Sequence, residues 1–175
     1  MTFTFFSIFF SLTALIAQDQ QKIDSLSQVL STDLRDEKRV DIYNAIAVEY
    51  YKFDFTKTTI FANKAYLLSE SIGYSNGIVD TYYLNGSVAR ASGDFLGARE
   101  FFIKALTISN ENNYLKGEAY ALAGFAKLFE DTNEYSQALE YYLQSLRINE
   151  ALEDKSRIPG IYNQMGIIYR RQGDY

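Results

Sequence analysis

The chain has 175 residues, of which 47% are hydrophobic and 22% are charged. A chain of this length and composition can build one ordinary hydrophobic core, so a disordered, highly charged segment is excluded. The 17 Lys and Arg stand against 22 Asp and Glu, which gives a net charge of -5. Because a chain with net negative charge repels a phosphate backbone, we expect no nucleic-acid partner.

The missing residue types exclude several chemistries. The sequence has no His and no Cys, so disulfides are impossible, as are nucleophiles and zinc sites that depend on these residues. No phosphate-binding glycine loop and no other catalytic constellation is present. We therefore predict a protein without enzymatic activity, cofactor or metal. One Pro, 15 Tyr and 13 Phe indicate a helical protein that packs through aromatic rings.

The first element in chain order is an uncharged apolar run from Phe3 to Ile16, followed by Ala17 and a polar stretch. The run is too short to cross a hydrocarbon layer of roughly 30 Å comfortably, and it has the form of a signal peptide. We predict a signal peptide over residues 1–17, cleaved after Ala17, and an exported chain that is periplasmic or secreted. The alternatives are an uncleaved membrane anchor with the rest of the chain outside the cytoplasm, or a buried helix.

Residues 18–38 are predicted to form an N-terminal capping helix and a linker. Between Gln20 and Leu34, apolar residues with helical spacing share one face: Ile23, Leu26, Val29 or Leu30, and Leu34. A polar outer face would let this helix cover the apolar side of the element that follows, as the end of a stacked array requires.

From residue 39 onward the sequence repeats. An acidic residue followed by an aromatic one recurs at 40-residue intervals, at Asp54, Asp94, Glu134 and Asp174. The apolar residues around these positions recur at spacings of three and four, which is the period of a helix face. We therefore predict pairs of helices in repeats over about 39–78, 79–118 and 119–158, with a partial repeat over 159–175.

The recurring residues have local physical roles. A carboxylate at a helix start accepts free backbone N–H groups, so the acidic residues should cap the second helix of each pair. Gly93 and Gly173 precede two of them and are expected to adopt a positive φ. In the first repeat the matching residues come one position late, which predicts a turn one residue shorter. One column of small residues predicts close helix packing: Ala47, Gly86, Ala126 and Gly166.

At these residues the chain resembles the tetratricopeptide repeat family. The second and third repeats match its pattern at Gly86, Gly93, Phe95, Ala98, Phe102, Ala105 and Leu106, and at Ala126, Tyr135, Ala138, Tyr142 and Leu146. The first repeat departs from it, with Phe53 for Gly and Thr58 for Ala. The usual repeat has about 34 residues, so extra residues are expected between one helix pair and the next, at 69–77, 109–117 and 149–157. This lengthened form resembles the repeats of bacterial exported and sensor proteins.

The resemblance implies an all-α fold, a right-handed α-solenoid of antiparallel helix pairs whose first helices line a concave groove. Such grooves bind peptides or neighbouring domains in the family. The residues expected to line the groove here are Asn44, Tyr51, Lys52, Tyr83, Ser87, Arg90, Lys127, Glu130, Asn163, Arg170 and Arg171. The basic members suit an acidic peptide; the alternative is an ordinary solvated helix face.

These expectations lead to two functional hypotheses. The first is a non-enzymatic scaffold that binds a protein or peptide partner in the groove. The second is the N-terminal sensory region of a membrane-bound signalling protein, with a histidine kinase, cyclase or DNA-binding output domain beyond Tyr175. In the second hypothesis a downstream segment, rather than the repeats, would contact the membrane.

Overall fold

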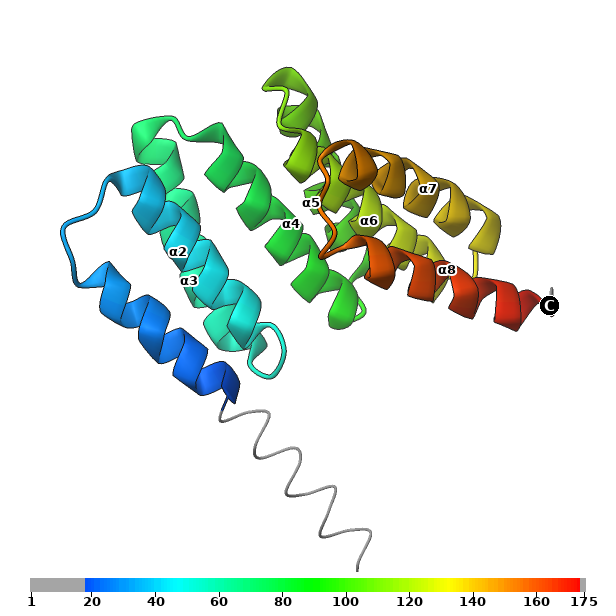
Figure 1. Ribbon diagram of the computed structural model, residues 1–175, viewed down its shortest axis with the longest axis horizontal. Helices are drawn as coiled ribbons and strands as arrows, with labels where there is room; N and C mark the ends of the chain where they lie inside the picture. The colour runs from blue at the N-terminus through cyan, green and yellow to red at the C-terminus, as the bar shows by residue number, and fades with distance from the viewer. Residues whose placement is uncertain (1–17, 174–175) are drawn as a thin grey trace, which may run out of the picture. The chain divides into compact units, whose positions relative to one another are not determined.

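The structure is a computed structural model that describes residues 18–173 (Figure 1). Within this range every regular element is an α-helix and no strand occurs, so the all-α prediction is confirmed. The predicted signal peptide over residues 1–17 lies outside the described residues.

The chain divides into two compact units, Met1–Gly73 and Tyr74–Tyr175. Unit 1 contains the helical residues 18–30, α2 (Asp36–Tyr50) and α3 (Phe55–Ile72). Unit 2 contains five helices, which are α4 (Ser75–Ala91), α5 (Phe95–Glu111), α6 (Leu115–Asp131), α7 (Tyr135–Ala151) and α8 (Ile158–Gln172).

In unit 1 the helix over residues 18–30 packs against α2. Ile23 is buried in one cluster with Ile42, Ile46 and Tyr50 of α2, and Leu26, Leu30 and Leu34 pack against that cluster. Of the two candidates left open for this face, Val29 is exposed, so Leu30 is the inward residue. The helix over residues 18–30 therefore covers α2, at the place where the sequence predicts a capping helix.

In unit 2 the helices form antiparallel hairpins, α4 with α5 and α6 with α7, while α4 also contacts α6 and α8 contacts α7 (Figure 1). The Phe102 ring of α5 is fully buried and lies against Gly86 of α4 and Gly124 of α6. A methyl group would come within 2.6 Å of the ring at Gly86 and within 2.5 Å at Gly124. Glycine at both positions therefore lets two helices approach one ring.

The helices of unit 2 end in closely similar turns. Helices α4 to α7 each span 17 residues, and a left-handed residue recurs every 20 positions at Gly73, Gly93, Asn113, Asn133, Glu153 and Gly173. After α4, the Gly93 N–H donates to the Arg90 carbonyl and the Asp94 N–H to the Ala89 carbonyl. This paired closure satisfies the last carbonyls of the helix within three residues. The positive φ predicted for Gly93 and Gly173 is confirmed.

Because two of the connections between helix pairs are so short, the prediction about the extra residues is wrong for two of its three segments. They were expected to lie between the helix pairs, but α5 continues to Glu111 and α6 begins at Leu115. Most of the residues at 69–77 and 109–117 therefore lengthen the helices, and only 73–74 and 112–114 link them. At 149–157 the prediction is confirmed, because residues 152–157 lie between α7 and α8. The left-handed residue makes a long connection unnecessary, since it reverses the chain within the turn itself.

A second prediction, of a shorter turn in the first repeat, is also wrong. Residues 51–54 separate α2 from α3, one more than the three that separate α4 from α5. Phe53 occupies the column that holds Gly93, and a bulky residue takes a positive φ only at a cost. Helix α2 accordingly ends in a right-handed residue, Tyr51, and the chain needs one further residue to turn.

The acidic column caps helices at two of the three positions that the structure describes. Asp54 accepts a hydrogen bond from the Lys57 N–H and Asp94 accepts one from the Gly97 N–H, each at 2.9 Å. Glu134 precedes α7 without capping it, and instead accepts from the Thr132 hydroxyl at 2.8 Å. Its side chain is one methylene longer, so its carboxylate reaches past the backbone N–H groups. Asp174 lies outside the described residues.

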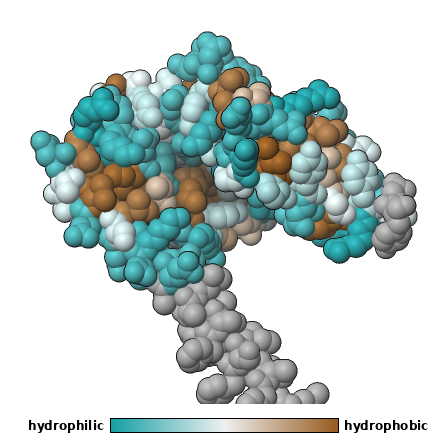
Figure 2. Space-filling model, in the orientation of Figure 1, coloured by the Kyte–Doolittle hydropathy of each residue, from teal (hydrophilic) through white to brown (hydrophobic). Residues whose placement is uncertain are grey.

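The surface carries no single dominant apolar area on the face drawn in Figure 2, where separate apolar areas lie among hydrophilic side chains. Among residues 18–173, none of the helices combines the length and the apolar character that a membrane crossing requires.

The contact of Phe102 with two glycines predicts a stability change. Gly124→Ala forces the buried ring to move, and we expect the free energy of unfolding to fall by about 1–3 kcal/mol, as overpacking of a core typically costs. Gly166→Ala is the matched control, because it adds a methyl to a helical glycine with no atom within 4 Å. The control should be neutral or up to about 1 kcal/mol more stable through helix propensity. Urea unfolding followed by circular dichroism checks both; a Gly124→Ala protein as stable as Gly166→Ala would contradict the packing.

Candidate functional site

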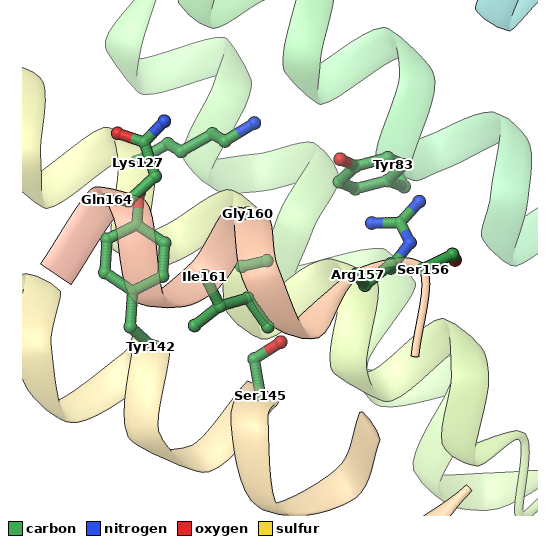
Figure 3. Close-up of a pocket in the computed structure, with 10 residues that line it drawn as sticks. Tyr83, Lys127, Tyr142, Ser145, Ser156, Arg157, Gly160, Ile161 and Gln164 are labelled. Atoms are coloured by element: carbon green, nitrogen blue, oxygen red, sulfur yellow. The ribbon is translucent and has the colours of Figure 1, made fainter. Parts of the chain in front are cut away.

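A pocket of about 220 Å³ opens in unit 2 between α4, α6, α7 and α8 (Figure 3). Its lining residues are Tyr83, Ala123, Lys127, Tyr142, Ser145, Ser156, Arg157, Gly160, Ile161 and Gln164. Helices α4, α6 and α8 are the first helices of successive pairs, so the pocket lies on the surface where the resemblance placed a groove. Of the expected groove residues, Tyr83 and Lys127 line it.

Arg157 enters the pocket from the residue that precedes α8. Its guanidinium carbon lies 3.4 Å from the centre of the Tyr120 ring, and the Tyr120 and Tyr83 rings are 5.4 Å apart. A guanidinium on a ring face is attracted by the π electrons. The stack therefore joins α4, α6 and the start of α8 along one wall of the pocket.

The late start of α8 has a cause in the sequence. Helices α4 and α6 begin at Ser75 and Leu115, whereas α8 begins at Ile158, three positions after the 40-residue period would place it. Pro159 occupies the first turn of α8, and because proline has no N–H it cannot donate to the carbonyl of Lys155. Residues 155–157 consequently form a turn that carries Arg157.

The second cation of the pocket is Lys127 of α6. Figure 3 shows its side chain extending toward the Tyr83 hydroxyl, with the Arg157 guanidinium next to the same tyrosine. Burial by itself raises the pKa of Tyr83, but the positive charges of Lys127 and Arg157 outweigh it and lower that pKa below its ordinary value. Two positively charged side chains therefore face Tyr83 in this pocket. Among the described residues, Lys127 forms no ion pair.

None of the ten lining residues is acidic, although the whole chain carries 22 Asp and Glu. Two of the lining hydroxyls are already bonded inside the protein, since Ser145 donates to the Ala119 carbonyl at 2.8 Å and Tyr142 donates to Glu130 at 3.1 Å. The nearby Asp154 accepts from Ser156, and this hydrogen bond lowers the pKa of the Asp154 carboxyl. The lining side chains whose polar groups are bonded neither to the backbone nor to a carboxylate are Tyr83, Lys127, Arg157 and Gln164, and Arg157 is hydrogen-bonded to Tyr83.

Three of the expected groove residues instead hold helices together. Arg90 of α4 pairs with Asp131 of α6. Glu130, whose side chain is only 12% exposed, accepts from the Tyr142 hydroxyl and lies 3.4 Å from Arg171 of α8. Burial and the neighbouring Glu130 raise the pKa of Tyr142 above its ordinary value. These ion pairs join α4, α6 and α8, so Arg90, Glu130 and Arg171 have internal roles.

The other expected residues of unit 2 surround the pocket without lining it. Ser87 is buried, and its hydroxyl donates to the Tyr83 carbonyl at 2.9 Å. Asn163 and Arg170 are exposed on α8. The residue of α8 that faces the pocket at this level is Gln164, next to the predicted Asn163.

The three expected groove residues of unit 1 lie on or beside the end of α2. Asn44 is buried within α2, and the Tyr51 ring stacks on Phe55 with the ring centres 5.4 Å apart. Lys52 pairs with Glu49 and Asp19 at 2.6 and 2.7 Å, while Lys22 of the capping helix also pairs with Glu49. Hydrogen bonds to Asp19 and Glu49 raise the pKa of Lys52. This cluster fastens the capping helix to α2.

Sequence reasoning missed Arg157 and Gln164, although one signal for Arg157 was present. Positions 77, 117 and 157 form a column at the 40-residue period, and it reads Gly, Gly, Arg. Gly117 needs to be small, because a methyl there would lie 2.5 Å from Val79. An arginine in a column that otherwise requires glycine indicates that the third helix starts differently and that a charged side chain enters the groove.

Comparison with known proteins agrees with this fold. A family model described as tetratricopeptide repeat matches residues 77–151, which contain α5, α6 and α7 and most of α4. Residues 77–151 therefore belong to the tetratricopeptide repeat family.

Proteins with a similar sequence carry the name photosystem I assembly protein Ycf3. The chain is 29% identical to the one from Rippkaea orientalis over 93 residues, which are 53% of this chain and 49% of the relative. It is 27% identical to the one from Prochlorococcus marinus over 122 residues, 66% of this chain and 65% of the relative. The chain thus spans about half the length of the first of these curated relatives.

Two solved structures share the fold. BtubC from P. vanneervenii has a TM-score of 0.66 at 22% identity, covering 93% of this chain and 67% of that one. The apo form of RapI also has a TM-score of 0.66, at 20% identity, covering 99% of this chain and 64% of that one. These likenesses support a helical-repeat architecture.

The cluster at Lys52 predicts a pH dependence. Burial opposes the charge on Glu49, but hydrogen bonds from Lys22 and Lys52 outweigh burial, and the pKa of Glu49 is lowered. A carboxyl with a lowered pKa adds stability above its unfolded pKa, and this stability is lost as pH falls through the folded pKa. Glu49→Gln should therefore lower the free energy of unfolding by about 1 kcal/mol at pH 7, since both lysines are half-exposed and screened.

The difference between Glu49→Gln and the unaltered chain should shrink below about pH 4, where an ordinary glutamate also becomes protonated. Urea unfolding at pH 7, 5 and 3 measures it. Glu70→Gln, which neutralises an exposed glutamate on α3, is the control and should leave stability unchanged at each pH. A constant difference for Glu49→Gln from pH 7 to 3 would show that the ion pairs do not stabilise unit 1.

Proposed function

We propose that the chain is a non-catalytic interaction module that binds an extended segment of a protein partner in the groove lined by α4, α6 and α8. The observation that carries this proposal is the pocket itself, which presents Lys127 and Arg157 without an acidic neighbour in its lining. The repeat match supports a protein-binding role. From the assembly proteins among its relatives we carry over only the idea of a scaffold.

The partner segment in this proposal is acidic at the position that enters the pocket. Lys127 and Arg157 supply two positive charges, and Arg157 keeps the edge of its guanidinium available while its face lies on Tyr120. This assignment is narrower than the basic set expected from the sequence, because Arg90 and Arg171 already pair with Asp131 and Glu130. A right-handed superhelical twist of the repeats belongs to the same proposal. The comparisons give no support to the sensory hypothesis.

Charge reversal in the pocket tests the binding role. Acidic peptides are first selected from a displayed library on the unaltered chain. Lys127→Glu should lower the affinity for these peptides by at least about tenfold, because an attraction becomes a like-charge repulsion. Lys155→Glu makes the same charge change on an exposed residue outside the pocket lining and should change affinity by less than about twofold. Titration calorimetry measures both.

A library that yields no acidic peptides, or equal affinity for the Lys127→Glu and Lys155→Glu proteins, would contradict the proposed groove. Circular dichroism of both variants checks that the helices are retained, so that a loss of binding is not a loss of fold.

We further propose that the chain is exported, on the basis of the apolar run from Phe3 to Ile16. Expression in a bacterial host followed by N-terminal sequencing should give a mature chain that begins at Gln18. An unprocessed N-terminus on a membrane-associated product would favour the anchor, and an unprocessed soluble product in the cytoplasm would contradict export.

A further inference from the structure

The donors of the unit 2 pocket come from three directions. The Tyr83 hydroxyl belongs to α4, the Lys127 ammonium to α6, and the Arg157 guanidinium to the turn before α8 (Figure 3). Gln164 adds an amide from α8. A ligand that satisfies all of them must present oxygens that do not lie in one plane.

This arrangement distinguishes between two kinds of anion. A carboxylate has one negative charge and two oxygens in one plane, whereas a phosphate monoester has a charge of about -1.5 to -2 and three oxygens on a tetrahedron. The two cations of the pocket, Lys127 and Arg157, balance the charge of a phosphate monoester better than that of a carboxylate. The Arg157 face is occupied by Tyr120 at 3.4 Å, so only its edge N–H groups can turn to a ligand, and such an edge binds two phosphate oxygens well.

The rest of the pocket suits a side chain that carries the phosphate. Ala123, Gly160 and Ile161 form apolar parts of its lining and can contact the carbon atoms of a serine or threonine stem. A volume of about 220 Å³ exceeds what one or two oxygens of a carboxylate would fill. Both the charge and the shape of the pocket thus exceed the needs of an acidic side chain.

We propose that the pocket formed by Tyr83, Lys127, Arg157 and Gln164 binds a phosphorylated side chain of the partner. This inference rests on the proposed function, because the phosphate arrives on the segment that occupies the groove. It adds that the interaction depends on phosphorylation of that segment.

The test uses the chain itself and three small probes at constant ionic strength. The probes are N-acetyl-phosphoserine amide, N-acetyl-glutamate amide and inorganic phosphate, and binding is followed by the NMR shifts of the backbone amides of Ala123 and Gly160. The phosphoserine probe should bind saturably and at least about tenfold more tightly than the glutamate probe, which corresponds to one additional charge-assisted hydrogen bond.

Matched substitutions assign the binding to the pocket. Lys127→Gln and Arg157→Gln should each lower the affinity for the phosphoserine probe by about tenfold. Lys155→Gln and Arg147→Gln make the same changes at exposed positions outside the lining and should leave the affinity unchanged. If Arg157→Gln disturbs the start of α8, Lys127→Gln still tests the site, because Lys127 makes no ion pair among residues 18–173.

A pH series separates a dianion from a singly charged ligand. The second pKa of a phosphate monoester is about 6, so the affinity of the phosphoserine probe should fall several-fold from pH 7.5 to 5.5, while that of the glutamate probe should not. Equal affinity for the two probes, insensitivity to Lys127→Gln, or inorganic phosphate binding as tightly as the phosphoserine probe would each overturn the inference. Acidic peptides that still depend on Lys127 in that case would leave the proposed function standing.

Discussion

The close contact between an aromatic ring and two glycines determines how the helices of unit 2 pack. Phe102 lies against Gly86 of α4 and Gly124 of α6, and this contact sets how near the two helices can come. Their approach brings the Tyr83 and Tyr120 rings to 5.4 Å, and those rings receive Arg157. The wall of the pocket is thus a consequence of core packing several residues away. A fixed wall also reduces the ordering that a bound segment must impose, which favours affinity.

Charged residues on the first helices of the pairs, α4, α6 and α8, divide into two groups with different roles. Arg90, Glu130 and Arg171 form ion pairs between helices, and in each pair one side chain, Arg90 or Glu130, is largely buried while its partner is more exposed. Removing the exposed partner would leave a largely buried charge uncompensated. Lys127 lies on the same surface without such a partner among the described residues. The difference lies in the neighbours, since an acidic residue is within reach of each paired cation, whereas the pocket lining contains none. Position on a groove therefore does not by itself indicate a role in recognition.

The period of the sequence predicted most of the fold, because the spacing of apolar residues dictates which face of a helix is buried. The helix pairs, the capping helix and the left-handed glycines follow from it. Glu134 does not cap α7 as predicted, because its side chain is one methylene longer than that of Asp. The turn at Phe53 was predicted to be one residue shorter because the matching residues of the first repeat come one position late, whereas it is one residue longer. The groove residues were predicted only in part: Tyr83 and Lys127 line the pocket, whereas Arg157 comes from a turn whose shape depends on Pro159. Pairing between charges 41 positions apart, as for Arg90 and Asp131, has no signature in a single sequence.

The left-handed residues recur every 20 positions, so each helix with its turn has the same length as the next. After two 20-residue segments, each a helix with its turn, the chain runs again in its original direction, whereas after one segment it runs in the opposite direction. Duplication or excision of 40 residues between equivalent turns would keep first and second helices alternating at the new junction, while a change of 20 would place two helices of the same kind next to each other. Lineages of this protein can therefore gain or lose length in whole hairpins, and the number of hairpins becomes a quantity that selection can adjust to the size of a partner.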